Sequence, residues 1–170
     1  MGVRKHKSAV EGYNIELVLE VNESREPYER LGSSGEVALL FAHLKHYHRE
    51  HFIVVCVDAK LRLTAVHTCS IGTLTASIVH PREVFKVVCV GNASGIIVLH
   101  NHPSGDPLPS DEDKRITSRL EEAGQLMGIP LLDHLIIGRN GGYHSFADPG
   151  DISHETSGYR GMVLREGKEG

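Results

Sequence analysis

The sequence has few cysteines, no long apolar run and no strong positive charge, and each shortage narrows what the chain can be. No apolar stretch approaches the ~18 residues of a membrane-spanning helix, and none follows the basic residues near the start. We therefore expect no membrane partner and no secretory signal. The 170 residues suffice for one domain but not for a (β/α)₈ barrel, which needs roughly 200 residues or more.

The three cysteines, Cys56, Cys69 and Cys89, form no CxxC pair and are odd in number. Each lies in an apolar run, where a thiol behaves as a small hydrophobic side chain, so we expect Cys69 and Cys89 in the core. This usage predicts a reduced, cytoplasmic protein. The formal net charge of −4 argues against a strongly basic nucleic-acid-binding face.

Apolar periodicity predicts one α/β (α+β) domain with a mixed central sheet flanked by helices. Ser33 and Glu36 form a capping-box pattern, and the apolar face behind them predicts a helix that continues to Arg49. The predicted elements are strand 15–21, helix 33–49, strands 52–58, 61–70 and 76–79, a helix from 81, strand 95–100, helix 110–127, and strands 129–138 and 143–146. We expect residues 1–32 to be a lead-in, loose over 1–14 before the first strand, 33–146 to be the main domain, and 147–170 to be a loosely held tail.

The most informative residues follow the strand at 95–100. His100 and His102 are two positions apart, and in an extended backbone such residues point to the same side. Two imidazoles in this arrangement can bind one Zn²⁺, which in catalytic sites takes three protein ligands and keeps a fourth position for water. Asp113 is the candidate third ligand, because Ser110 as an N-cap places Asp113 in the first helical turn. The spacing predicts one zinc ion per chain.

The adjacent letters HNH (100–102) are weak support for a nuclease, because nucleases of that name spread these residues over a ββα unit. The spacing His100-x-His102-x₇-Ser110-x-x-Asp113 instead resembles the JAMM motif of MPN+ metalloproteases. The similarity to the bacterial RadC family extends over about 33–146. It rests on the strings HNHPSGDPLPS (100–110), HPREVF (80–85) and LLDHLIIG (131–138). The helix-hairpin-helix module frequent in that family has no counterpart here, so the chain resembles a short form.

The resemblance implies an MPN fold with a cytidine-deaminase-like arrangement, Zn²⁺ as cofactor, and hydrolysis of amide or isopeptide bonds. It places the general base at Glu50, before the strand at 52–58, with Glu36 as the reserve candidate. A general base takes a proton from the attacking water and returns it to the leaving amine. For Ser110, the alternatives are a plain helix N-cap and an added role as hydroxyl donor to the oxyanion.

Several other polar residues have a plain and a functional interpretation. Asp106 is expected to be a turn residue. His134 could orient a metal ligand, but we favour a core histidine bonded to Asp133. His43 and His46, at i and i+3, could hold a metal, although a solvated helix face is favoured.

The favoured function is a zinc-dependent metallohydrolase of JAMM type, a metallopeptidase or isopeptidase whose substrate the sequence does not name. The alternatives are a non-enzymatic DNA repair or replication accessory protein with a metal site, and a metal-dependent nuclease. The DNA association rests on the family name alone. A structural zinc normally has four protein ligands, and only three are evident here, which favours an enzyme. The oligomeric state is left open.

Overall fold

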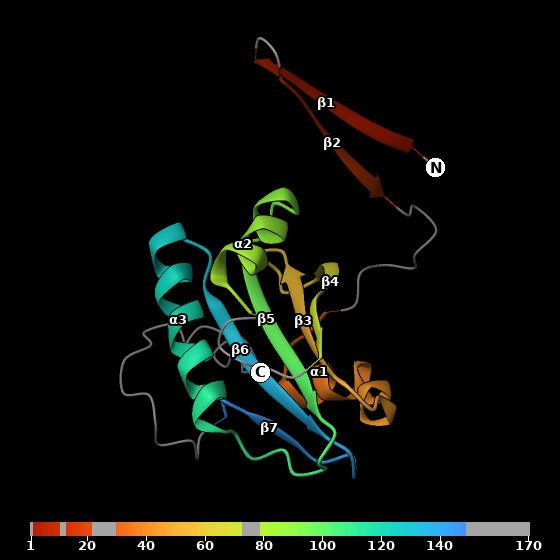
Figure 1. Ribbon diagram of the computed structural model, residues 1–170, viewed down its shortest axis with the longest axis vertical. Helices are drawn as coiled ribbons and strands as arrows, with labels where there is room; N and C mark the ends of the chain where they lie inside the picture. The colour runs from red at the N-terminus through yellow and green to blue at the C-terminus, as the bar shows by residue number, and fades with distance from the viewer. Residues whose placement is uncertain (1, 11–12, 22–29, 73–78, 149–170) are drawn as a thin grey trace, which may run out of the picture.

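The computed structural model describes residues 2–10, 13–21, 30–72 and 79–148, and a five-stranded mixed sheet forms its centre (Figure 1). The strands lie in the order β4-β3-β5-β6-β7; β5 and β6 are parallel, and the other neighbours are antiparallel. Their bounds are β3 Glu50–Val57, β4 Leu63–Gly72, β5 Gly95–His102, β6 Leu131–Gly138 and β7 Tyr143–Ser145. The helices are α1 Ser34–Leu40, the 3₁₀-helix η1 Ala42–His46, α2 Pro81–Val90 and α3 Asp111–Met127. The predicted α/β class is confirmed.

The strands β3 and β5 are buried on both faces of the sheet, which explains their nearly continuous apolar sequences. Odd-numbered residues of both strands pack on α1 and η1, whereas even-numbered residues pack on α2 and α3. We call these the α1 face and the α3 face. Since neighbouring strand residues point to opposite faces, His100 and His102 continue the α3-face row of Ile96 and Val98.

The helix predicted over 33–49 is shorter in the structure. Ser33 caps it as expected, but α1 ends at Leu40, and the chain continues as η1 before becoming extended at Tyr47. A 3₁₀-helix has three residues per turn and so stacks side chains at i and i+3. Phe41, at the start of η1, and Leu44, three residues later, are both buried in the α1-face core. His48, inside the predicted helix, lies beyond η1 and is exposed.

Two apolar side chains of the helices lie at the surface, and one of them, Cys89, was expected in the core. Cys89 is exposed, because α2 buries Val84, Phe85 and Val88 and turns the cysteine away from the sheet. Met127 is 45% exposed at the end of α3, where Gly128 terminates the helix in the left-handed conformation with φ 68°. Cys69 is partly buried, and it packs against the α3-face core.

The N-terminal segment forms an antiparallel hairpin of β1 (Gly2–Val10) and β2 (Tyr13–Val21). β2 contains the strand predicted at 15–21, but β1 occupies a stretch that we expected to be loose. The strand expected at 76–79 lies, apart from Val79, outside the described residues, as does most of the tail expected from 147. Among the helices of the described ranges, none has the length and apolar character needed to cross a membrane.

Candidate metal centre

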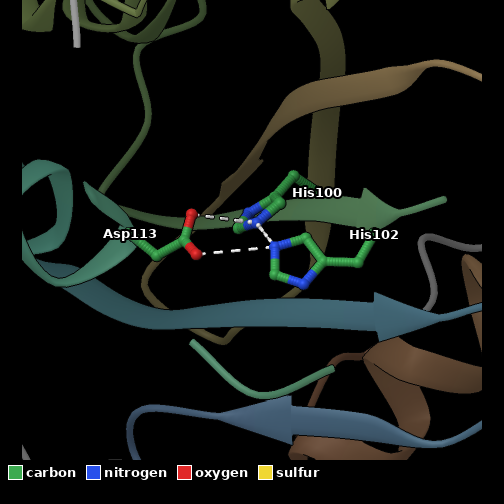
Figure 2. A group of neighbouring side chains, drawn as sticks. All are labelled: His100, His102 and Asp113. Carbon is green, nitrogen blue, oxygen red and sulfur yellow. Dashed lines mark hydrogen bonds and ion pairs between the residues drawn. The ribbon is translucent and has the colours of Figure 1, made fainter. Parts of the chain in front are cut away.

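The end of β5 and the beginning of α3 bring His100, His102 and Asp113 together (Figure 2). The Nε2 atoms of the two histidines lie 2.9 Å apart. Asp113 Oδ1 lies 3.1 Å from His100 Nε2, and Asp113 Oδ2 lies 3.4 Å from His102 Nε2. Within the described part of the chain, this is the group of histidine, cysteine and acidic side chains that could hold a metal ion.

Of the two histidines, His100 lies closer to the core, and burial restricts its ring. The ring of His100 is fully buried and stacks on Phe52 of β3, with ring centroids 6.0 Å apart and planes inclined by 15°. His102, one strand repeat further on, retains 14% side-chain exposure. The site thus opens to solvent on the side of His102 and is closed by the core on the side of His100.

Asp113 serves the helix and the site with the same carboxylate. Its Oδ2 accepts the backbone N–H of Ser110 at 2.8 Å and the Ser110 hydroxyl at 2.6 Å, which completes the capping box of α3. Burial raises the pKa of Asp113, but its contacts with the two imidazoles of His100 and His102 and the hydrogen bond from the Ser110 side chain outweigh burial and hold that pKa well below its usual range. The carboxylate is therefore ionised at neutral pH.

The three side chains fit a divalent cation. His102 Nδ1 lies 2.8 Å from the carbonyl oxygen of Asp106, which can only accept, so Nδ1 carries a proton, and Nε2 is the atom that offers a lone pair to a metal when the ring is neutral. Tetrahedral bonds of about 2.0–2.1 Å place neighbouring zinc ligand atoms roughly 3.3 Å apart. The three observed separations lie within a few tenths of an ångström of that value. A positive charge is also favoured here, because burial lowers the pKa of His102 while Asp113 and Asp106 raise it above its ordinary value on balance.

The loop between the ligands depends on a glycine in β6. A Cβ added to Gly138 would lie 2.6 Å from the carbonyl oxygen of Gly105 and 3.0 Å from Cδ of Pro107. The loop can therefore fold against β6 and present the Asp106 carbonyl to His102. Asp106 is a turn residue as expected, since its side chain accepts the Leu108 N–H at 3.0 Å, but its backbone also orients a ligand.

Glu50, the predicted general base, begins β3 beside the site. It lines a surface cavity of about 510 Å³ together with His48, Arg49, Gly72, Pro103 and Ser104. Its strand position matches that of Phe52, whose ring stacks on His100, so alternation places Glu50 on the α3 face. The Glu50 carboxylate is also close enough to contribute to the raised pKa of His102.

Asn101, the central letter of HNH, faces away from the metal ligands and holds the segment around Glu50. Its Oδ1 accepts the His51 N–H at 2.8 Å, and its Nδ2 donates to the carbonyls of Arg49 at 3.0 Å and Tyr47 at 3.4 Å. The side chain is 1% exposed. These bonds fix the backbone on both sides of Glu50, a role that the sequence did not suggest.

His134 differs from the favoured sequence interpretation. Its ring does not bond the Asp133 carboxylate, which instead accepts the backbone N–H of His134 at 2.7 Å. The ring lies between His100 and Thr117, with His134 Nε2 2.9 Å from His100 Nδ1. Thr117 was missed entirely, although its position four residues after Asp113 on α3 places it on the same helix face.

The remaining candidates lie elsewhere. Glu36, the reserve base, accepts the Gly32 N–H at 2.7 Å from the exposed first turn of α1. His43 and His46 are exposed on η1, and neither belongs to a potential metal group among the described residues. His43 contacts Phe41 and Tyr47 through its ring instead.

Comparison with known proteins tests the predicted resemblance. The family model of the RadC-like JAB domain matches residues 31–151, a range that contains the candidate metal centre, Glu50 and His134. The chain belongs to the RadC family. The resemblance based on the motif is thereby confirmed.

Three relatives illustrate how far this RadC-family similarity extends. A UPF0758 protein of Thermotoga maritima is 45% identical over 124 residues, which cover 73% of this chain and 55% of the relative. A UPF0758 protein of Methanosarcina barkeri is 42% identical over 153 residues, covering 89% and 66%. A UPF0758 protein of Syntrophomonas wolfei is 55% identical over 100 residues, covering 59% and 43%. The chain thus spans between about two fifths and two thirds of these relatives.

Proposed function

We propose that this chain is a zinc-dependent hydrolase that cleaves amide or isopeptide bonds, with the ion held by His100, His102 and Asp113. The observation that carries the proposal is the convergence of these three donors next to a cavity lined by a carboxylate. Membership of a JAB-domain family is consistent with hydrolytic chemistry. Three protein ligands are the number that zinc enzymes use, since catalysis needs one open position.

When bound, the metal supplies a Lewis acid that polarises the scissile carbonyl and lowers the pKa of a water molecule. The protein supplies the proton transfers. Glu50 takes the proton from the attacking water and delivers it to the nitrogen of the leaving amine, while the substrate occupies the cavity between Glu50 and Pro103. The open side of the site at His102 gives the substrate access.

Ser110 is the proposed donor to the oxyanion. Its hydroxyl donates to Asp113 Oδ2 at 2.6 Å, so the oxyanion role requires the hydroxyl to turn toward the substrate. Its backbone N–H also donates to Asp113 Oδ2 at 2.8 Å, so the cap keeps a partner when the hydroxyl turns. Removal of a comparable donor lowers turnover by roughly 10²–10³.

Metal analysis is the first test, because it needs no substrate. We expect about one zinc per purified chain by elemental analysis, and loss of that zinc in His100→Ala and Asp113→Ala. His46→Ala is the matched control, since His46 is an exposed histidine on η1. A wild-type chain that binds no zinc at micromolar concentration would contradict the proposal.

Hydrolysis is the second test. Libraries of peptides and isopeptide-linked peptides, read by mass spectrometry, should show cleavage that a chelator abolishes and Glu50→Gln lowers by at least ~10² at unchanged zinc content. Glu122→Gln, at an exposed position of α3, is the control. Chelator-sensitive cleavage of DNA in place of peptides would assign the same site to a nuclease, and salt-dependent DNA binding without cleavage would favour an accessory role.

A further inference from the structure

A buried row of hydrogen bonds connects the metal centre with the interior of α3. His100 Nδ1 lies 2.9 Å from His134 Nε2, and His134 Nδ1 lies 2.6 Å from the hydroxyl of Thr117. That hydroxyl donates to the backbone carbonyl of Asp113 at 2.6 Å. His134 is fully buried and Thr117 is 1% exposed, so water does not compete for these bonds. The row begins at one proposed metal ligand and ends on the backbone of another.

The donor and the acceptor of each hydrogen bond follow from the bond at the end of the row, between Thr117 and the Asp113 carbonyl. A carbonyl oxygen can only accept, so the single hydroxyl hydrogen of Thr117 points to Asp113. The Thr117 oxygen must therefore accept from His134, which places the ring proton of His134 on Nδ1. The neutral His134 ring then has its lone pair on Nε2, so the adjacent Nδ1 of His100 carries the proton. The lone pair of His100 is left on Nε2, the atom that faces His102 and Asp113.

His134 is neutral in this environment. Its ring is fully buried, and its two nitrogens face a hydroxyl and another imidazole, so a charge on the ring would have no carboxylate partner. A neutral imidazole has one N–H and one lone pair, so the position of its single proton decides what both neighbours must do.

We propose that Thr117 and His134 are positioning residues that hold His100 in the tautomer whose Nε2 binds the metal. The inference rests on the proposed metal site and extends it to residues that do not touch the ion. Metal-binding histidines generally donate their other ring N–H to a partner that fixes tautomer and orientation. Here that partner is another histidine, and its own tautomer is set by a threonine in the adjacent helix.

Removal of the Thr117 hydroxyl should reverse the direction of the hydrogen bond between His134 and His100. The N–H at His134 Nδ1 would then be buried without an acceptor, at a cost of roughly 1–3 kcal/mol. The opposite tautomer avoids this cost by placing the proton on His134 Nε2, which then donates to His100 Nδ1. The proton of His100 moves to Nε2, where it occupies the position that the metal needs.

Thr117→Val is the decisive variant, because valine keeps the branched shape and removes only the hydroxyl. We expect the dissociation constant for zinc, measured by competition with a chromophoric chelator, to rise by about 10–100-fold. Thr117→Ser restores the hydroxyl and should stay within about threefold of wild type. Thermal unfolding in excess chelator controls for folding, since a loss of stability alone would leave the zinc competition of the folded fraction unchanged.

Nitrogen-15 NMR of the histidine rings shows which ring nitrogen carries the proton. A role of Thr117 in packing alone would leave this unchanged. The wild-type protein and Thr117→Ser should show His134 and His100 protonated at Nδ1, whereas Thr117→Val should show both protonated at Nε2. Wild-type zinc affinity in Thr117→Val, or a His134 ring protonated at Nε2 in wild type, would overturn the inference. Failure of the wild-type chain to bind zinc would refute the proposed function. The ring spectra would still show whether Thr117 sets the tautomers of His134 and His100.

Discussion

At the C-terminal end of β5, the side chains on the two faces of the strand have different roles. On the α3 face, His100 and His102 turn toward Asp113 and form the candidate metal centre. On the α1 face, Asn101 turns toward the segment 47–51 and holds the backbone that carries Glu50. A strand places its neighbours on opposite sides, so three consecutive residues can position both a metal ion and a base. The middle residue of HNH therefore supports the candidate site from the face opposite the candidate metal ligands.

Among the variants that test the two faces, Asn101→Ala should lower the free energy of unfolding most. It leaves the His51 N–H without its acceptor, at a cost of roughly 1–3 kcal/mol, and removes the two hydrogen bonds donated to the Arg49 and Tyr47 carbonyls, worth about 0.5–1.5 kcal/mol each. We expect the free energy of unfolding to fall by about 3 kcal/mol, measured by urea denaturation, and amide exchange to accelerate over 47–51. Zinc affinity should change little, because the ligands lie on the other face.

Asn101→Asp is the matched variant, since it keeps the acceptor for His51 and loses the two donated bonds. A strong loss of zinc affinity in Asn101→Ala, without faster exchange over 47–51, would show that the two faces are not separate in their roles.

Gly138→Ala tests the α3 face through the loop that connects His102 with Ser110 and packs against Gly138. The added methyl would lie 2.6 Å from the carbonyl oxygen of Gly105, so the loop must move and the bond from His102 to Asp106 weakens. Overpacking of this kind costs about 1–3 kcal/mol, and we expect zinc affinity to fall by roughly tenfold. Isothermal titration with zinc measures the change. Unaltered affinity would mean that the loop is not needed to orient His102.

Asp133 and His134 extend the comparison to β6, where neighbouring residues again point to opposite sides. Burial raises the pKa of Asp133 to about 6, even though Ser145, Ala147 and His134 donate hydrogen bonds to its carboxylate. The folded state therefore binds a proton more tightly than the unfolded state, and this contribution to stability is lost as the pH rises through about 6.

Asp133→Asn should remove this pH dependence. Relative to the variant, we expect the wild type to gain about 1 kcal/mol of unfolding free energy between pH 7 and pH 5, measured by urea denaturation in chelator. The same comparison at two pH values above 7 is the control, because no gain is expected there. A wild type that loses stability relative to the variant on acidification would contradict the raised pKa.

The candidate metal ligands were predictable from the sequence because their geometry is local. His100 and His102 share a side of one strand, and Asp113 follows a helix cap three residues earlier. Partners that depend on strand pairing and helix packing were not predictable in this way. His134 meets His100 only through the parallel register of β5 and β6, and Thr117 reaches His134 only after α3 packs on the sheet. Likewise, the helical period after Ser33 did not reveal that α1 ends at Leu40 and that the chain continues as η1.

One carboxylate joins the first turn of α3 to the metal centre. Asp113 accepts from the backbone that begins the helix and faces the two imidazoles at the same time. Fraying of that turn therefore disassembles the cation-binding group, and an ion bound there opposes fraying. Occupancy by a cation should accordingly be visible as slower amide exchange in residues 113–117, several ångströms into a helix whose remaining turns never meet the ion.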